Sequence, residues 1–388
     1  MIGLNIFLFV VGLIMLIKGG DFFVDGASGV ARRFHLPELL IGATVVSIGT
    51  TLPEVMVSAQ GAIAGSGSMA YGNAIGSIIC NTSLIAALTI AIKPAKTERK
   101  ALILPVTFFF VAAAFYVFVA YFFGEFSRWV GITLLAIFAV YITSTIIQMK
   151  KTSPLEIDGI VETPPAIEEE TEEAKHVSFL TLAIEALIVF VGGGIMIYRG
   201  GIFRWIAIAM IVVFAAYAVI TSVRKLLKKA PLGMLNEIFF IVIGAAVIAG
   251  GANLLVDSGT AIAKDFGVPE TVIALTFVAL GTSLPELVTA ITALAKGHGA
   301  LSLGNIIGAN LFNLVLVSGV ATTISPFHVP AESQLMGVPA SFLIDIPVML
   351  GVMLLLTVPT LITKKLSRVQ GIVLLCVYAA FCTIQFVM

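Results

Sequence analysis

Charged residues are scarce in this chain: Asp, Glu, Lys and Arg make up only 11% of its 388 residues, whereas soluble domains carry about 25%. Hydrophobic residues make up 59%, and the mean hydropathy is +1.10. The apolar runs are long enough for helices of roughly 20 residues, the length that spans a bilayer. They lack the alternation of polar and apolar residues that is typical of a membrane barrel. The composition therefore predicts an all-α, polytopic membrane protein.

Other chemical signatures are absent as well. The formal net charge is zero, which argues against a nucleic-acid partner. The three cysteines, Cys80, Cys376 and Cys382, lie in apolar runs without metal-ligand spacing and are expected to be small buried hydrophobes. The sequence has no HExxH zinc pair and no paired nucleophile and base in its repeated segments. We therefore expect neither an enzyme nor a bound cofactor. The apolar N-terminus has no basic n-region and is expected to span the membrane uncleaved.

One segment of the sequence occurs twice. Gly49–Glu54 reads GTTLPE, and 232 positions later Gly281–Glu286 reads GTSLPE. The match extends without a gap to further pairs: Asp25 and Asp257, Pro37 and Pro269, Glu38 and Glu270, Thr44 and Thr276, Gly72 and Gly304, Asn73 and Asn305, Gly76 and Gly308, Asn81 and Asn313. A carboxylate inside a membrane helix is costly and usually functional. The repeat therefore predicts two copies of one membrane unit, each with one buried acid.

The apolar runs predict about twelve transmembrane helices. Spans are expected at 3–24, 37–63, 70–92, 101–122, 128–149, 178–198, 203–224, 235–257, 269–295, 302–325, 337–359 and 368–387. Residues 1–149 form the first five-helix repeat, 178–230 an extra hairpin and 231–388 the second five-helix repeat. The acidic loop at 150–177 has no EF-hand spacing, so we expect a solvated linker rather than a Ca²⁺ site.

Basic residues predict the orientation of these helices. With the N-terminus outside, all but four of the 22 Lys and Arg lie in or beside cytoplasmic connections, the four being Arg128, Arg199, Arg204 and Lys264. This bias follows the positive-inside rule. Because five helices are an odd number and a hairpin is even, the second repeat enters the membrane inverted, and both termini are expected outside. Inverted repeats around a midplane site are typical of secondary transporters.

Polar side chains surround the first glutamate. Four oxygen-bearing side chains share one helix face by their spacing of three and four residues: Ser47, Thr50, Thr51 and Glu54. Pro53 removes a backbone donor, so we expect the helix to break there and to free carbonyl oxygens for a ligand. The next predicted helix adds Ser77 and Asn81, one turn apart.

The second copy supplies a similar but poorer set: Thr282, Ser283, Glu286 and Asn313. Ala279 replaces Ser47, and Ala309 replaces Ser77. Folding the halves about a pseudo-two-fold axis brings the two glutamates together near the midplane, among oxygen donors without sulfur or imidazole. Such a shell suits a hard cation, and Ca²⁺ takes about 6–8 oxygens. Two ionised carboxylates repel each other when no cation lies between them. The site is therefore expected always to hold Ca²⁺, several Na⁺ or protons.

These segments resemble the two alpha-repeats of the cation/Ca²⁺ exchanger superfamily, in particular the prokaryotic Na⁺/Ca²⁺ exchangers. The resemblance is specific over residues 36–90 and 268–322 and is mostly topological elsewhere. It implies a ten-helix core in which the second and third helices of each half hold the ions. The ion-site residues that it implies are Ser47, Thr50, Thr51, Glu54, Ser77, Asn81, Ala279 (through its backbone carbonyl), Thr282, Ser283, Glu286 and Asn313.

Three departures from the family pattern bear on ion choice. Ala309 stands where the family often has serine, which weakens one Na⁺ subsite. Asn313 stands where potassium-dependent members have aspartate, which argues against K⁺ cotransport. The GTTLPE form with its proline differs from the GNATE form of proton exchangers and favours Na⁺ as the counter-ion.

The sequence thus leads to one main hypothesis and two alternatives. The main one is a secondary-active antiporter of the cell (inner) membrane that exchanges Ca²⁺ for Na⁺ by alternating access. An H⁺/Ca²⁺ antiporter with Glu54 and Glu286 as proton carriers is the alternative within the same family. A cation channel is less expected, because a channel filter is normally repeated around a multi-subunit pore. The expected partners are the lipid bilayer and the transported ions.

Overall fold

The computed structural model describes residues 2–151, 234–265, 281 and 283–387, apart from residues 35, 64, 66, 95, 96, 98, 332 and 333. The predicted extra hairpin, the acidic loop beyond residue 151 and the first part of the predicted 269–295 span lie outside these residues. Nine helices within the described ranges are long and apolar enough to cross a membrane, and the apolar helix Leu284–Ala295 is shorter. The prediction of an all-α, polytopic membrane protein is confirmed.

The described elements of the first half follow the predicted spans closely, except that the first helix continues to Arg33 beyond its expected end at 24. They are α1 (Ile2–Arg33), α2 (Glu38–Ile41), the π-helical turn η1 (Gly42–Val46), α3 (Ser47–Ile63), α4 (Gly67–Cys80), the π-helical turn η2 (Asn81–Ala86), α5 (Ala87–Ile92), α6 (Arg99–Phe123), β1 (Glu125–Phe126) and α7 (Arg128–Lys151). Because η1 joins α2 to α3, and η2 joins α4 to α5, each of these runs forms one membrane span.

The second half repeats this order. Its described elements are α10 (Met234–Asp265), α13 (Leu284–Ala295), α14 (Gly299–Phe312), η4 (Asn313–Val317), α15 (Ser318–Ile324), β2 (Phe327–His328), β3 (Gln334–Leu335), β4 (Val338–Pro339), η5 (Ser341–Asp345), α16 (Ile346–Thr363) and α17 (Arg368–Val387). The predicted 337–359 span starts later than expected. Residues 334–339 form a tight β3–β4 hairpin, with Gly337 at a φ of 77°, before η5 begins.

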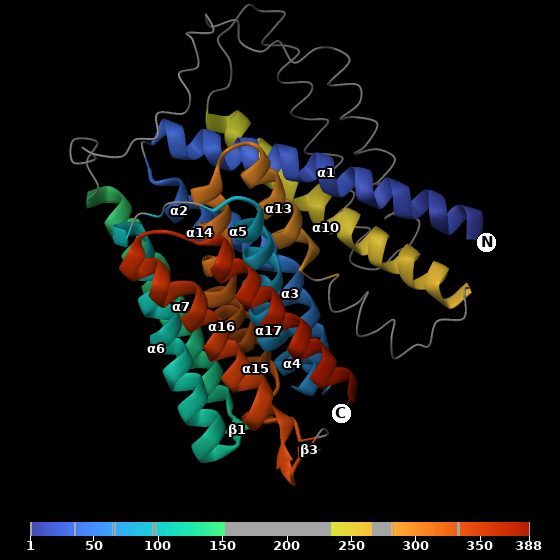
Figure 1. The fold of residues 1–388 in the computed structure, drawn as a ribbon, viewed down its shortest axis with the longest axis vertical. Helices are drawn as coiled ribbons and strands as arrows, with labels where there is room; N and C mark the ends of the chain where they lie inside the picture. The colour runs from blue at the N-terminus through green and yellow to red at the C-terminus, as the bar shows by residue number, and fades with distance from the viewer. Residues whose placement is uncertain are drawn as a thin grey trace, which may run out of the picture.

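The first helices of the two halves, α1 and α10, pack side by side along their length and cross the remaining helices (Figure 1). Their backbones touch at glycines. A Cβ atom on Gly12 would lie 2.9 Å from the Gly251 carbonyl oxygen, and one on Gly19 would lie 3.1 Å from that of Gly244. Since residue numbers rise along α1 as they fall along α10, the two helices are antiparallel, as inverted repeats require.

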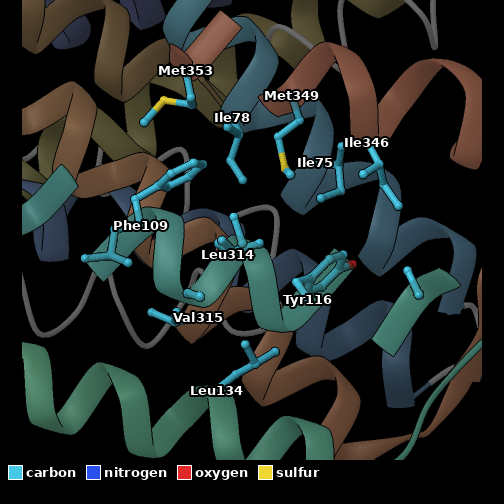
Figure 2. Close-up of a cluster of buried hydrophobic side chains, with 14 of the residues drawn as sticks. Ile75, Ile78, Phe109, Tyr116, Leu134, Leu314, Val315, Ile346, Met349 and Met353 are labelled. Carbon is cyan, nitrogen blue, oxygen red and sulfur yellow. The ribbon is translucent and has the colours of Figure 1, made fainter. Parts of the chain in front are cut away.

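A cluster of mostly apolar side chains fills the space between α4, α6, η4 and α16 (Figure 2). It includes Ile78 from α4, Phe109 from α6, Leu314 from η4, and Met349 and Met353 from α16, each at most 1% exposed. The core therefore ties the third helices of both halves to α6 and α16, and this fixes the helices that carry Asn81 and Asn313.

Apolar side chains also cover the outside of the bundle. Trp129 of α7 is 77% exposed and Ile362 of α16 is 75% exposed. Helix α17 presents most of its length outward, since only 11% of its most apolar window is buried. Extended apolar surfaces of this kind are typical of proteins that face lipid.

Candidate functional site

Two glutamates, Glu54 of α3 and Glu286 of α13, are each fully buried with an exposed fraction of 0%. Their carboxylates interact electrostatically, which puts the acids of the two halves at one place. Within the described part of the chain, none of their four carboxylate oxygens has a hydrogen-bond partner. A buried carboxylate without partners is among the costliest groups that a protein can hold. The arrangement favours a positively charged ligand.

Four more of the predicted site residues have buried polar atoms that lack a partner among the described residues: Thr51, Asn81, Ser283 and Asn313. Native structures leave few such atoms, so a group of them calls for an explanation. Together with the two carboxylates they offer hydroxyl, amide and carboxylate oxygens. That is the donor set that hard cations such as Ca²⁺ and Na⁺ prefer.

Side chains of one half lie next to the acid of the other half. Thr50 of α3 lies close to the Glu286 carboxylate. Cys80, which precedes Asn81, lies close to both Ser283 and Glu286. In addition, α3 contacts α4, α13 and α14, and α13 contacts η2. The candidate site is thus assembled from both halves at once.

The hydroxyls of Ser47 and Thr50 serve a structural contact as well. The Ser47 Oγ lies 2.8 Å from the Gly42 carbonyl oxygen and 2.9 Å from that of Asn305, and it can donate to either. Thr50 Oγ1 donates to Asn305 Oδ1 at 3.2 Å. These bonds tie α3 to α14 of the opposite half. Both hydroxyl oxygens retain lone pairs for a cation, but their protons already have acceptors.

Of the remaining predicted site residues, one lies among the described residues and two do not. Ser77 is buried on α4 with 4% of its surface exposed. Ala279 and Thr282 lie outside the described residues.

The expected break at Pro53 is wrong, because α3 continues through it from Ser47 to Ile63. The irregularity lies at least two turns earlier, in the π-helical turn η1. Two other π-helical turns, η2 and η4, begin at Asn81 and Asn313, which are both candidate ligands. π-turns widen the backbone and are frequent at functional sites. In the second half, α13 begins at Leu284 with Pro285 in its first turn, where a proline costs no hydrogen bond.

Serine hydroxyls stabilise two of these wide turns in the same way. Ser47 bonds the carbonyl of Gly42 at 2.8 Å, and Ser318 bonds that of Asn313 at 3.1 Å. Each pair spans the ends of a π-turn, five residues apart. The backbone next to the site is therefore held in its irregular shape by side chains that the sequence supplies locally.

Two asparagines illustrate what the repeat pattern indicates and what it misses. Asn73, one of the repeated residues, donates to the Glu54 carbonyl at 3.1 Å and to Ser58 Oγ at 2.8 Å, so it joins α4 to α3. Asn310 was not singled out, because its counterpart in the first copy is Ile78. It donates to Thr82 Oγ1 at 2.7 Å and so joins α14 to η2. An asparagine in an apolar run is itself a signal for such a bond.

Comparison with known proteins agrees with this geometry. The family model described as sodium/calcium exchanger protein matches residues 4–147 and 236–387. The sodium/calcium exchanger MaX1 of Methanosarcina acetivorans is 28% identical, with 100% of this chain and 99% of MaX1 covered. The putative antiporter CaxA of Alkalimonas amylolytica is 30% identical, with 96% and 95% covered.

A solved structure is similar over almost the whole chain. It is that of the sodium-calcium exchanger NCX_Mj soaked with Na⁺ and Ca²⁺, with a TM-score of 0.68 and 26% sequence identity. The alignment covers 98% of both chains. The similarity therefore extends well beyond the two repeated segments.

Proposed function

We propose that this chain, which belongs to the sodium/calcium exchanger protein family, exchanges Ca²⁺ for Na⁺ at a single site between Glu54 and Glu286. Members of this family are antiporters and not enzymes. One observation carries the proposal: two fully buried carboxylates from opposite halves interact with each other and have no partner among the described residues. Ca²⁺ or Na⁺ is the transported substrate that would neutralise them.

The charge of the site explains why transport would be coupled. Two carboxylates without a cation between them repel each other, by about 4 kcal/mol for two unit charges 4 Å apart in an environment of intermediate polarity. A carrier without a bound cation would change slowly between its inward-open and outward-open conformations. Ca²⁺ balances both charges at once, and two Na⁺ do the same. Each ion would therefore leave only when the other replaces it.

The proposed ion ligands are the residues named from the sequence. Thr51, Glu54, Asn81, Ser283, Glu286 and Asn313 would contribute side-chain oxygens that lack other partners among the described residues. Ser47, Thr50, Ser77 and Thr282 would contribute hydroxyl oxygens, and Ala279 its backbone carbonyl. The second half has fewer side-chain donors, since Ala279 and Ala309 replace serines.

Alternating access requires two states of the protein that bind the ions with different affinity. We propose that α1 and α10 slide as one unit over the ion-binding helices. Their shared glycine contact makes them a pair. Both α1 and α10 contact α13, α10 also contacts α3, and Phe23 of α1 lies against Gly49 of α3. The positive-inside pattern supports an orientation in a cell membrane with both termini outside.

Radioactive calcium uptake into proteoliposomes tests the proposal. Vesicles loaded with Na⁺ and diluted into Na⁺-free medium are expected to take up calcium, whereas vesicles with only an outward H⁺ gradient are not. Uptake driven by protons alone would replace Na⁺ by H⁺ as the counter-ion, with the same glutamates as carriers. Uptake under neither gradient, by protein that elutes as a folded species, would contradict the exchanger itself.

A further inference from the structure

A second polar cluster, partly buried, lies at the start of α16. Its acid is Asp345, the last residue of the π-helical turn η5. The Asp345 Oδ1 accepts a hydrogen bond from Gln385 Nε2 of α17 at 2.7 Å. No other acid occurs in the described helices that pack here, α4, α6, α16 and α17. The first half has Ala113 at the corresponding position, so the cluster is not part of the repeat.

A buried tyrosine faces this acid. Tyr71 of α4 is 3% exposed, and its hydroxyl has no hydrogen-bond partner in the described part of the chain. The hydroxyl lies close to the Asp345 carboxylate and to Ser341, the first residue of the same π-turn. A tyrosine hydroxyl in an apolar core is normally paired, because an unmade bond is costly. Its position beside an acid indicates that a ligand completes the cluster.

The backbone around Asp345 is also of the kind found at the main site. Four π-helical turns occur in the described residues. Three of them adjoin candidate ion ligands: η1 ends next to Ser47, η2 begins at Asn81 and η4 begins at Asn313. The fourth, η5, has Ser341 at its start and Asp345 at its end. Because π-helical turns are frequent at functional sites, η5 also indicates a functional site.

We propose that Asp345, Ser341, Tyr71 and Gln385 form a second cation site, which binds one monovalent ion such as Na⁺. The single carboxylate matches one positive charge, and the carboxylate and hydroxyl oxygens suit a hard ion, while Gln385 orients the carboxylate by donating from Nε2. No Lys, Arg or His among the described residues forms an ion pair with Asp345. Asp345 is partly buried near the start of the apolar Ser341–Thr363 span, where a carboxylate without a countercharge is costly.

Further hydroxyls lie between this cluster and the central site. Tyr116 of α6 is fully buried, its hydroxyl also lacks a partner among the described residues, and it lies close to Tyr71 and Ser318. Ser318 in turn bonds the carbonyl of Asn313, a candidate central ligand. The second cation site therefore lies at the end of a polar path toward the transported ions.

Na⁺ binding in the absence of the central site tests this proposal. The full chain with Glu54→Gln and Glu286→Gln is purified, and its thermal unfolding midpoint is followed as NaCl replaces choline chloride at constant ionic strength. We expect the midpoint to rise with Na⁺. Adding Asp345→Asn is expected to weaken the apparent Na⁺ affinity by about tenfold or more, and Tyr71→Phe, which removes only the hydroxyl, by a few-fold.

Tyr121→Phe is the matched control. The Tyr121 hydroxyl is near the same turn but already donates to the Phe342 carbonyl, so its loss is expected to leave the Na⁺ response unchanged. If the double glutamine protein shows no Na⁺-dependent stabilisation, or if stabilisation survives Asp345→Asn, the second site does not exist. Should Asp345→Asn fail to fold, an unchanged Na⁺ response in Tyr71→Phe overturns the proposal equally.

Discussion

Gly12 of α1 lies against the backbone of Gly251 in α10, and the sequence repeat makes this contact self-complementary. The repeat counterpart of Gly12 is Gly244, and that of Gly251 is Gly19; these two residues also face each other. Reciprocal contacts of this kind are the mark of a two-fold axis. The described structure therefore carries the inverted symmetry of the two halves directly in the packing of their first helices.

This contact predicts opposite effects for two glycine substitutions on the same pair of helices. A Cβ atom at Gly251 would lie 2.9 Å from both the Gly12 carbonyl oxygen and the Leu16 nitrogen, so Gly251→Ala is expected to destabilise the protein by about 1–3 kcal/mol. Gly3 of α1 has no atom within 4 Å of its Cβ position. Gly3→Ala is expected to be neutral or to stabilise, by up to about 1 kcal/mol.

Thermal or denaturant unfolding in detergent measures this difference. An equal loss of stability in both variants would mean that α1 and α10 are not in backbone contact at Gly251.

Substitutions of two buried threonines are expected to affect different quantities: one lowers the Ca²⁺ affinity and the other lowers the stability. Thr51 Oγ1 has no partner among the described residues, so Thr51→Val removes a proposed ligand and is expected to lower the Ca²⁺ affinity by about ten- to a hundredfold. Thr82 Oγ1 donates to the Ile78 carbonyl at 2.8 Å and accepts from Asn310. Thr82→Val leaves the Asn310 amide with only the weak acceptor Met353 Sδ, at 3.2 Å, and is expected to cost about 1–3 kcal/mol of stability with little change in affinity.

Calcium titration calorimetry and ion-free unfolding measure the two quantities. If Thr51→Val lowers stability and leaves the Ca²⁺ affinity intact, its hydroxyl has a structural partner instead of an ion.

Asn313→Asp tests the charge of the site. Asn313 is fully buried at the start of η4, and none of its side-chain polar atoms has a partner within the described part of the chain. A third carboxylate raises the repulsion in the absence of cations and the attraction for a divalent ion. The variant is expected to unfold at a lower temperature than the parent without Ca²⁺ and to gain more stability from saturating Ca²⁺. Equal midpoints in both conditions would place residue 313 outside the ion site.

The sequence predicts the positions of most helices. It does not predict where a helix ends when ion pairs of its polar side chains stabilise additional turns. The observed α6, Arg99–Phe123, lies within two residues of the predicted span at 101–122. Helix α1 was expected to end at 24 but continues to Arg33. Its polar last turns are stabilised by partners distant in sequence: Lys296 pairs with Asp25 at 2.8 Å and Glu237 with Arg33 at 2.8 Å. Hydropathy alone contains no information on such contacts.

For the candidate site, the sequence repeat indicated the two glutamates. The hydrogen-bond partners of the individual hydroxyl groups could not be predicted from it. Ser47 and Thr50 share a face with Glu54, yet both bond Asn305 from a helix more than 250 residues away. The expected break at Pro53 was wrong because η1 provides the irregular backbone at least two turns earlier. A π-turn has no residue signature comparable to proline, so only coordinates locate it.

The shared site is tested most directly by the stoichiometry of calcium binding. Titration calorimetry is carried out on the parent protein, on Glu54→Gln and on Glu286→Gln, in choline buffer without Na⁺ and after confirming that each protein is folded. The account predicts one high-affinity Ca²⁺ per parent chain and none in either single variant, because both carboxylates neutralise the same ion. A single variant that still binds one Ca²⁺ with parental affinity would contradict it and would mean that the two glutamates act separately.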